Sequence, residues 1–299
     1  MSGALWAVLA GVGFGLFQTV NRRAVRGMDV FVATFIQLAV SAVILVGASL
    51  ATEPVTVVWT APAMALINFG LAGLFHFVIG WTLLNASQKR IGAARTSPLI
   101  GTTPLFGTAF AVLALREVPS PLTILGILTI VGGIYLISTD APERNGAGSS
   151  QTASDWTGVT FGLGAAMVWA ISPIFIRFGL SGLPSPLLGV TVSMVVSAAA
   201  YGIALWARRR PWAGLIESRE VLVIKLLAGV LVGFSVWARW IALALAPVGV
   251  VLALALMSVP VVMLLSPLVV GRHLERVTSR LWAGASLTVS GAVVLVLIR

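Results

Sequence analysis

The chain has 299 residues, a mean hydropathy of +1.05, 59% hydrophobic residues and only 9% charged residues. Soluble globular domains carry about 25% charged residues, so this composition excludes a soluble protein and predicts a multi-pass membrane protein. The formal net charge of +10 could suggest nucleic-acid binding, but the arginines cluster in short segments between apolar runs, as orientation signals do, and we exclude a nucleic-acid partner. Because the chain has no cysteine, it has no disulfide, thiolate metal site or thiol nucleophile.

Apolar runs separated by charged residues, proline or glycine predict ten membrane-spanning helices. Each span needs about 20 apolar residues to cross the hydrocarbon core, and the runs lack the alternation typical of barrel strands. The first five cover residues 3–21, 30–51, 61–87, 93–115 and 121–138. A polar linker, 139–156, follows, and the second five cover residues 157–178, 186–207, 221–246, 248–270 and 279–298.

The two groups of five spans repeat one another. A shift of about 155 residues, with small gaps, aligns Gly3 with Gly158, Arg22 with Arg177, Trp81 with Trp237, Pro104 with Pro260, Glu117 with Glu275, Gly126 with Gly284 and Gly133 with Gly291. Because five is odd, the second half must enter the membrane from the opposite side, which gives the inverted repeat of alternating-access transporters. We therefore predict an all-α membrane fold with domains at 1–138 and 157–299.

The loops differ strongly in charge between the two predicted sides of the membrane. Fifteen basic residues fall on one side, namely Arg22, Arg23, Arg26, Lys89, Arg90, Arg95, Arg144, Arg208, Arg209, Arg210, Arg219, Lys225, Arg272, Arg276 and Arg280. The other side holds three, namely Arg116, Arg177 and Arg299. Because basic loops stay in the cytoplasm, we predict that both termini lie on the opposite, outer side of the membrane.

A shared motif runs through the fourth and fifth spans of each half. It comprises Pro98, Pro104, Leu115-Arg116-Glu117, Gly126 and Gly132-Gly133 in the first half, and Pro260, Gly271, Glu275, Gly284 and Gly291 in the second. This pattern resembles the drug/metabolite transporter superfamily, in particular its ten-span members with two EamA-type repeats. Within the superfamily the chain is similar to bacterial aromatic amino acid exporters. The resemblance implies export of a small molecule across a bacterial inner membrane, and the outer side that carries the termini is then the periplasm.

Strongly polar side chains inside the spans are the candidate substrate contacts, because polar groups are costly in a bilayer. Gln18 and Asn21 lie three residues apart on one helix face, where Gln18 could bind both ends of a zwitterion or only join two helices. His76 could line a cavity, carry a proton or pack as a neutral hydrogen-bonding group. Asn68 lies about two turns before His76 on nearly the same face.

Deep aromatic residues and one arginine complete the candidate binding site. Trp81, Trp169 and Trp237 could form flat walls for an aromatic substrate, or only pack helices together. Arg239 could bind a substrate carboxylate or extend along its helix to the membrane surface. The full set of candidate substrate-binding residues is Gln18, Asn68, His76, Trp81, Trp169, Ser172, Trp237 and Arg239.

Prolines and two glutamates are the candidate moving parts. Proline within a helix removes a backbone donor and permits a kink, so we assign a hinge role to Pro98, Pro104, Pro173 and Pro260. Glu117 and Glu275 stand at span ends next to arginine and are expected to form structural or gating ion pairs.

We predict a transporter that exports an aromatic, neutral or zwitterionic amino acid by facilitated diffusion, since no span contains a carboxylate to carry a proton. The alternatives are a proton-coupled exporter of other metabolites or drugs and, with less support, an intramembrane enzyme. An enzyme would need a nucleophile beside a base or paired acids, which the spans lack, so we predict no catalytic residue. We expect no cofactor and no metal. The expected partners are the amino acid and the lipid bilayer, with the oligomeric state left open, a monomer included.

Overall fold

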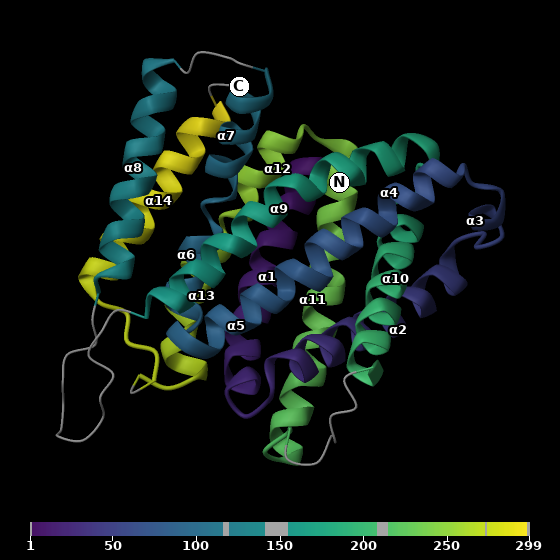
Figure 1. The fold of residues 1–299 in the computed structure, drawn as a ribbon, viewed down its shortest axis with the longest axis horizontal. Coiled ribbons are helices and arrows are strands. Elements are labelled where there is room, and N and C mark those ends of the chain that lie inside the picture. Colours follow the sequence, from purple (N-terminus) through teal and green to yellow (C-terminus); the bar gives the residue numbers. More distant parts are fainter. Residues whose placement is uncertain (1, 116–119, 141–154, 208–214, 273, 298–299) are drawn as a thin grey trace.

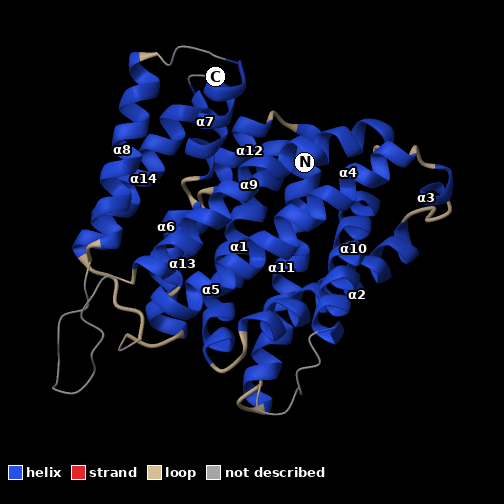
Figure 2. Ribbon diagram, viewed as in Figure 1, coloured by secondary structure: helices blue, strands red, loops and turns tan. Residues whose placement is uncertain are grey.

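The described part of the chain is helical (Figures 1 and 2). The computed structural model describes residues 2–115, 120–140, 155–207, 215–272 and 274–297. Within these ranges the only β-type pairing is an isolated bridge between Met28 and Ile216, so the predicted all-α fold class is confirmed. Seven helices of the described ranges are long and apolar enough to cross a membrane. The count of ten spans stays a prediction.

The helices follow the apolar runs closely. In the first half they are α1 (Gly3–Arg26), α2 (Val30–Thr52), α3 (Val57–Thr60), α4 (Ala63–Gly73), the π-helix η1 (Leu74–Gly80), α5 (Trp81–Ile91), α6 (Ala93–Ile100), α7 (Thr103–Leu115) and α8 (Pro121–Ser138). In the second half they are α9 (Trp156–Gly182), α10 (Pro186–Ala207), α11 (Arg219–Leu245), α12 (Val248–Ala255), α13 (Ser258–Val269) and α14 (Ser279–Leu297). Side-chain oxygens cap the first turns of six of these helices, as helix starts require, and they belong to Ser2, Asp29, Asp155, Ser185, Ser218 and Thr278.

The third predicted span contains a π-helical segment that the apolar pattern does not reveal. η1 stands between α4 and α5 and brings one full turn of wider hydrogen bonding into the middle of the span. π-helical insertions widen the helix locally and occur often at functional sites. His76 lies within this segment and is buried.

The fourth span of each predicted half is interrupted at an equivalent position. α6 ends at Ile100 and α7 starts at Thr103, while α12 ends at Ala255 and α13 starts at Ser258. The aligned prolines Pro104 and Pro260 fall in the first turn after each break, where a missing backbone donor costs little.

Helices of the two predicted halves pack against each other reciprocally. α1 lies on α11, α9 lies on α4 and α5, and α2 pairs with α10. At one edge of the molecule α8 and α14 lie side by side (Figure 1). Their backbones meet at repeat-aligned glycines, because a Cβ on Gly133 would lie 2.7 Å from Gly284 O and one on Gly291 would lie 2.7 Å from Gly126 O. This reciprocal packing between the halves favours the inverted repeat and the division into 1–138 and 157–299. Both stay predictions.

The start of α1 and the end of α14 lie on the same side of the molecule (Figure 1). We call the opposite side, where α1 ends and α6 and α11 begin, the basic end. Lys225 does not belong to the loop charges of this side, so its predicted loop position is wrong. Lys225 lies inside α11 and its side chain is fully buried. Without Lys225 the predicted charge bias is still strong.

Candidate functional site

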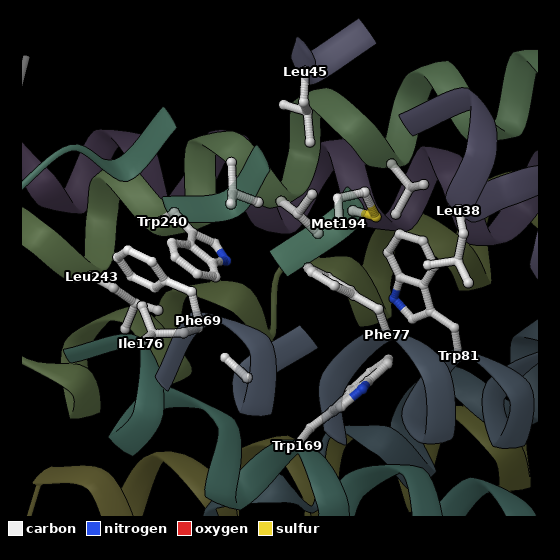
Figure 3. Packing of buried hydrophobic residues seen from close by; sticks show 14 of the residues in the cluster. Leu38, Leu45, Phe69, Phe77, Trp81, Trp169, Ile176, Met194, Trp240 and Leu243 are labelled. Atoms are coloured by element: carbon white, nitrogen blue, oxygen red, sulfur yellow. The ribbon is translucent and has the colours of Figure 1, made fainter. Parts of the chain in front are cut away.

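Six rings form a closed circuit in the interior of the molecule, between η1, α5, α1 and α9. The centroid distances around it are 5.0 Å for His76–Trp169, 5.6 Å for Trp169–Phe14, 5.3 Å for Phe14–Phe17, 6.4 Å for Phe17–Trp81, 4.9 Å for Trp81–Phe77 and 5.0 Å for Phe77–His76. Figure 3 shows Phe77, Trp81 and Trp169 in this part of the core. We call these six residues the aromatic circuit.

His76 is fixed on two sides by α9. Its ring is stacked on Trp169 with an interplanar angle of 15°, and its Nδ1 lies 2.8 Å from Ser172 Oγ. Trp169 in turn donates its indole N–H to the backbone oxygen of His76 at 2.9 Å. The structure therefore brings together three candidates that are 93–96 residues apart in the sequence. Stacked aromatic pairs and two hydrogen bonds make this a rigid wall.

Two further nitrogen-bearing side chains have unused donors. The indole nitrogen of Trp81 and the Nε and Nη2 atoms of Arg239 are buried without a hydrogen-bond partner in the described part of the chain. A buried donor without an acceptor is costly, so such donors commonly await a ligand or a water.

Three candidates lie apart from the circuit. The Asn68 amide donates to Met64 O of its own helix at 2.7 Å. Trp237 is half-buried and packs against Phe234, which is exposed. Gln18 belongs to a separate polar cluster at the basic end. The structure therefore does not bring Asn68, Trp237 and Gln18 into one site with His76.

Eight polar side chains from five helices form this second cluster, which we call the basic-end network: Gln18, Asn21, Thr34, Gln37, Asn85, Gln88, Ser97 and Lys225. Asn21 Nδ2 donates to Asn85 Oδ1 and Gln88 Oε1, both at 2.7 Å. Lys225 Nζ donates to Asn21 Oδ1 and, at 2.7 Å, to Gln37 Oε1. All eight side chains are buried, so this end of the molecule is closed by polar contacts.

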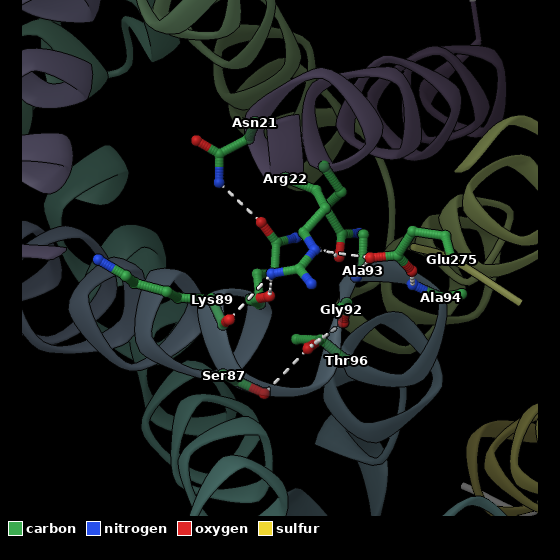
Figure 4. A network of polar contacts seen from close by, with 11 residues as sticks. Asn21, Arg22, Ser87, Lys89, Gly92, Ala93, Ala94, Thr96 and Glu275 are labelled. Atoms are coloured by element: carbon green, nitrogen blue, oxygen red, sulfur yellow. Dashed lines mark hydrogen bonds and ion pairs between the residues drawn. The ribbon is translucent and has the colours of Figure 1, made fainter. Parts of the chain in front are cut away.

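A buried ion pair lies directly beside this network (Figure 4). Arg22 Nε lies 2.6 Å from Glu275 Oε1, and the Arg22 guanidinium also donates to the backbone oxygens of Gln88 and Lys89. Glu275 accepts from the first backbone N–H groups of α6, those of Ala93 and Ala94, each at 3.2 Å. The carboxylate thus lies at a helix N-terminus, where negative charge is stabilised. This pair ties α1, α6 and the segment before α14 together.

The other candidate moving parts are placed as follows. Pro98 lies within α6, shortly before the break, and Pro173 lies within the continuous helix α9. Glu117 lies outside the described residues. Glu275 forms an ion pair, although its partner is Arg22 rather than the neighbouring arginine in the sequence. Its gating role stays a prediction.

Sequence reasoning missed Lys225, Gln37, Asn85 and Gln88 as interior residues. One signal was present, because polar residues three apart occur in three spans at the same end: Gln18 with Asn21, Thr34 with Gln37, and Asn85 with Gln88. Residues three apart share a helix face, so the three pairs could have been expected to meet. In the described residues no group of three or more metal-binding side chains occurs.

Comparisons with known proteins bear on this arrangement. Residues 1–139 match the EamA-like transporter family. This family consists of membrane transporters of small molecules, so the match indicates a membrane transporter. A solved structure described as "Crystal structure of protein" is 17% identical, covers 99% of this chain and 96% of that chain, and has a TM-score of 0.63. At that identity the likeness shows a shared fold alone. No curated protein matches the chain.

Proposed function

We propose that the chain exports a neutral or zwitterionic aromatic amino acid across the bacterial inner membrane by alternating access. The observation that carries this proposal is that two guanidinium nitrogens of Arg239, Nε and Nη2, are buried without a hydrogen-bond partner in the described residues, in a protein whose interior also holds the aromatic circuit. An aromatic amino acid presents a carboxylate and a flat ring, which match a guanidinium and aromatic walls.

Alternating access requires two parts that can open separately to each side. The reciprocal packing of α1 on α11 and of α9 on α4 and α5 supplies related contacts in both predicted halves. The basic-end network and the Arg22–Glu275 pair close one side, and in our proposal this side faces the cytoplasm. The termini would then be periplasmic. The family match covers the first predicted five-helix unit, which supports the proposed domain division.

Transport in this proposal is facilitated diffusion. The described acids lie in loops or at helix ends, so none is placed to carry a proton through the middle of a span. His76 and Lys225, by contrast, are titratable and buried within spans. A proton-coupled exporter is therefore the competing mechanism, and its test must include both residues.

The binding proposal is tested by counterflow of labelled L-phenylalanine in proteoliposomes. Arg239→Met should reduce competition by 3-phenylpropionate, which has a carboxylate but no amine, at least tenfold, as expected for a lost charge-assisted hydrogen bond. It should leave competition by phenethylamine, which lacks the carboxylate, unchanged. Arg23→Met is the matched control, because Arg23 forms an exposed ion pair with Glu220. Equal competition by 3-phenylpropionate in wild type and Arg239→Met would remove Arg239 from the site.

A further inference from the structure

Lys225 is a buried lysine whose hydrogen-bond partners within the described residues are all neutral. It lies two turns into α11, its side chain is fully buried, and its Nζ donates to the amide oxygens of Asn21 and Gln37. A lysine ammonium has three donors, so two amide oxygens leave one donor over. A buried charge without a counter-ion is strongly unfavourable.

Five of the seven carboxylate side chains in the described residues are engaged elsewhere. Arg22, Arg23, Arg90 and Arg95 pair with Glu275, Glu220, Asp155 and Asp140, respectively. Asp29 caps the start of α2. Within the described ranges no carboxylate forms an ion pair with Lys225.

A second unused donor lies next to Lys225. Gln37 accepts the Lys225 ammonium with its Oε1 at 2.7 Å, while its Nε2 is buried without a hydrogen-bond partner in the described part of the chain. Lys225 and Gln37 together thus offer a positive charge and at least two N–H donors that have no acceptor among the described residues. A small anion would neutralise the charge and accept both hydrogen bonds. We propose that Lys225 and Gln37 form an anion-binding site for a carboxylate at the basic end.

The site has a defined relation to Arg239. Lys225 and Arg239 are 14 residues apart on α11, which places them about 21 Å apart along the axis and within about 40° of the same face. α11 therefore presents two cations along one line through the molecule. If the proposed function holds, on which this step rests, the substrate carboxylate binds first at Lys225 and then at Arg239.

Only one of the two predicted repeats has a lysine at this position. The alignment that pairs Trp81 with Trp237 places Phe69 opposite Lys225. Phe69 is fully buried and packs on Trp240 with ring centroids 5.5 Å apart. The end of the molecule that carries the termini thus has an apolar layer where the basic end has a cation. A carboxylate arriving from the basic end has an additional binding site that one arriving from the other end lacks.

The first test measures anion binding without transport. Line broadening of 13C-acetate is recorded with the purified protein in nanodiscs. We expect broadening with the wild type, a loss of at least tenfold in affinity with Lys225→Met, and no change with Lys89→Met. Lys89 is the matched control because its ammonium lies at the same end and donates to the backbone of Met28. Equal acetate affinity of wild type and Lys225→Met overturns the proposal.

The second test supplies the missing counter-ion from within the chain. Gln37→Glu places a carboxylate where Gln37 Oε1 now accepts from Lys225, so it should abolish acetate binding and raise the melting temperature. In the double variant Gln37→Glu/Lys225→Met the same carboxylate has no cation, so the melting temperature should fall below that of Lys225→Met. If Lys225 were uncharged, Gln37→Glu would not raise the melting temperature, and the double variant would not melt below Lys225→Met. Failure to observe either of these two changes overturns the proposal.

The third test measures transport from each side of the membrane and distinguishes the anion site from the proposed function. In oriented proteoliposomes, Lys225→Met should raise the half-saturation concentration of L-phenylalanine at least fivefold from the basic end and leave it unchanged from the other end. An equal rise in the half-saturation concentration from both ends contradicts the proposal that the carboxylate binds first at Lys225 and then at Arg239. If the wild type carries no amino acid, the proposed function fails while the acetate measurements still decide whether the anion site exists.

Discussion

Removing the charge of Glu275 should destabilise the protein more than any other single loss of an ion pair at the basic end. Glu275 is 3% exposed, lies 2.6 Å from Arg22 Nε and accepts two backbone N–H groups of α6. Glu275→Gln keeps the shape and leaves the Arg22 guanidinium buried without its counter-ion. Breaking a buried pair by removing one partner costs about 3–5 kcal/mol. For a chain of this size that corresponds to a fall in melting temperature of about 6–10 °C.

The assay is thermal unfolding of purified protein in one detergent, followed by near-ultraviolet circular dichroism. Glu220→Gln is the matched control, because the Arg23–Glu220 pair is exposed, with side-chain exposures of 51% and 67%. Exposed ion pairs contribute about 0–1 kcal/mol, so this control should melt within about 2 °C of the wild type. Replacing both charged partners, Arg22→Met with Glu275→Leu, should recover part of the loss, since neither charge is then left alone. A Glu275→Gln protein that melts with the wild type would refute the reasoning.

Three further predictions follow from the interior contacts and the loop charges. Gly80→Ala should slow L-phenylalanine counterflow at least fivefold, because its Cβ would lie 2.0 Å from Trp169 Nε1, whereas Gly132→Ala, with open space around it, should not. Ser172→Ala should raise the half-saturation concentration for L-phenylalanine several-fold, since it removes the bond that orients His76, and unchanged kinetics would separate His76 from the substrate. In cells, Ser2→Cys should react with an impermeant thiol reagent and Gly148→Cys should not; the reverse pattern would contradict periplasmic termini.

The long helices could be predicted from the sequence because each is a continuous apolar run bounded by charge or proline. The predicted run 186–207 coincides with α10, and 121–138 coincides with α8. The interruptions were not predictable in this way. η1 and the breaks at residues 101–102 and 256–257 lie inside the predicted spans, and hydropathy does not distinguish between α and π hydrogen bonding.

The candidate site was predictable only where a single residue stood out from its surroundings. His76, Trp169 and Ser172 were identified as polar or aromatic residues in mid-span, and the structure places them in contact. Lys225 was counted with the loop charges, although it falls within the predicted span 221–246. Its true position depends on Asn21 and Gln37, which lie about 200 residues away in the sequence, and no local pattern contains that pairing.

Flux of L-phenylalanine through purified protein in liposomes tests the central claim most directly. We predict that net flux follows the amino acid gradient, stops when the inner and outer concentrations are equal, and is unaffected by an imposed pH difference. The His76→Ala and Lys225→Met variants should leave this dependence on the gradient unchanged, although their rates differ. Accumulation of L-phenylalanine against its gradient on imposing a pH difference, abolished by either variant, would contradict facilitated diffusion and identify the coupling residue.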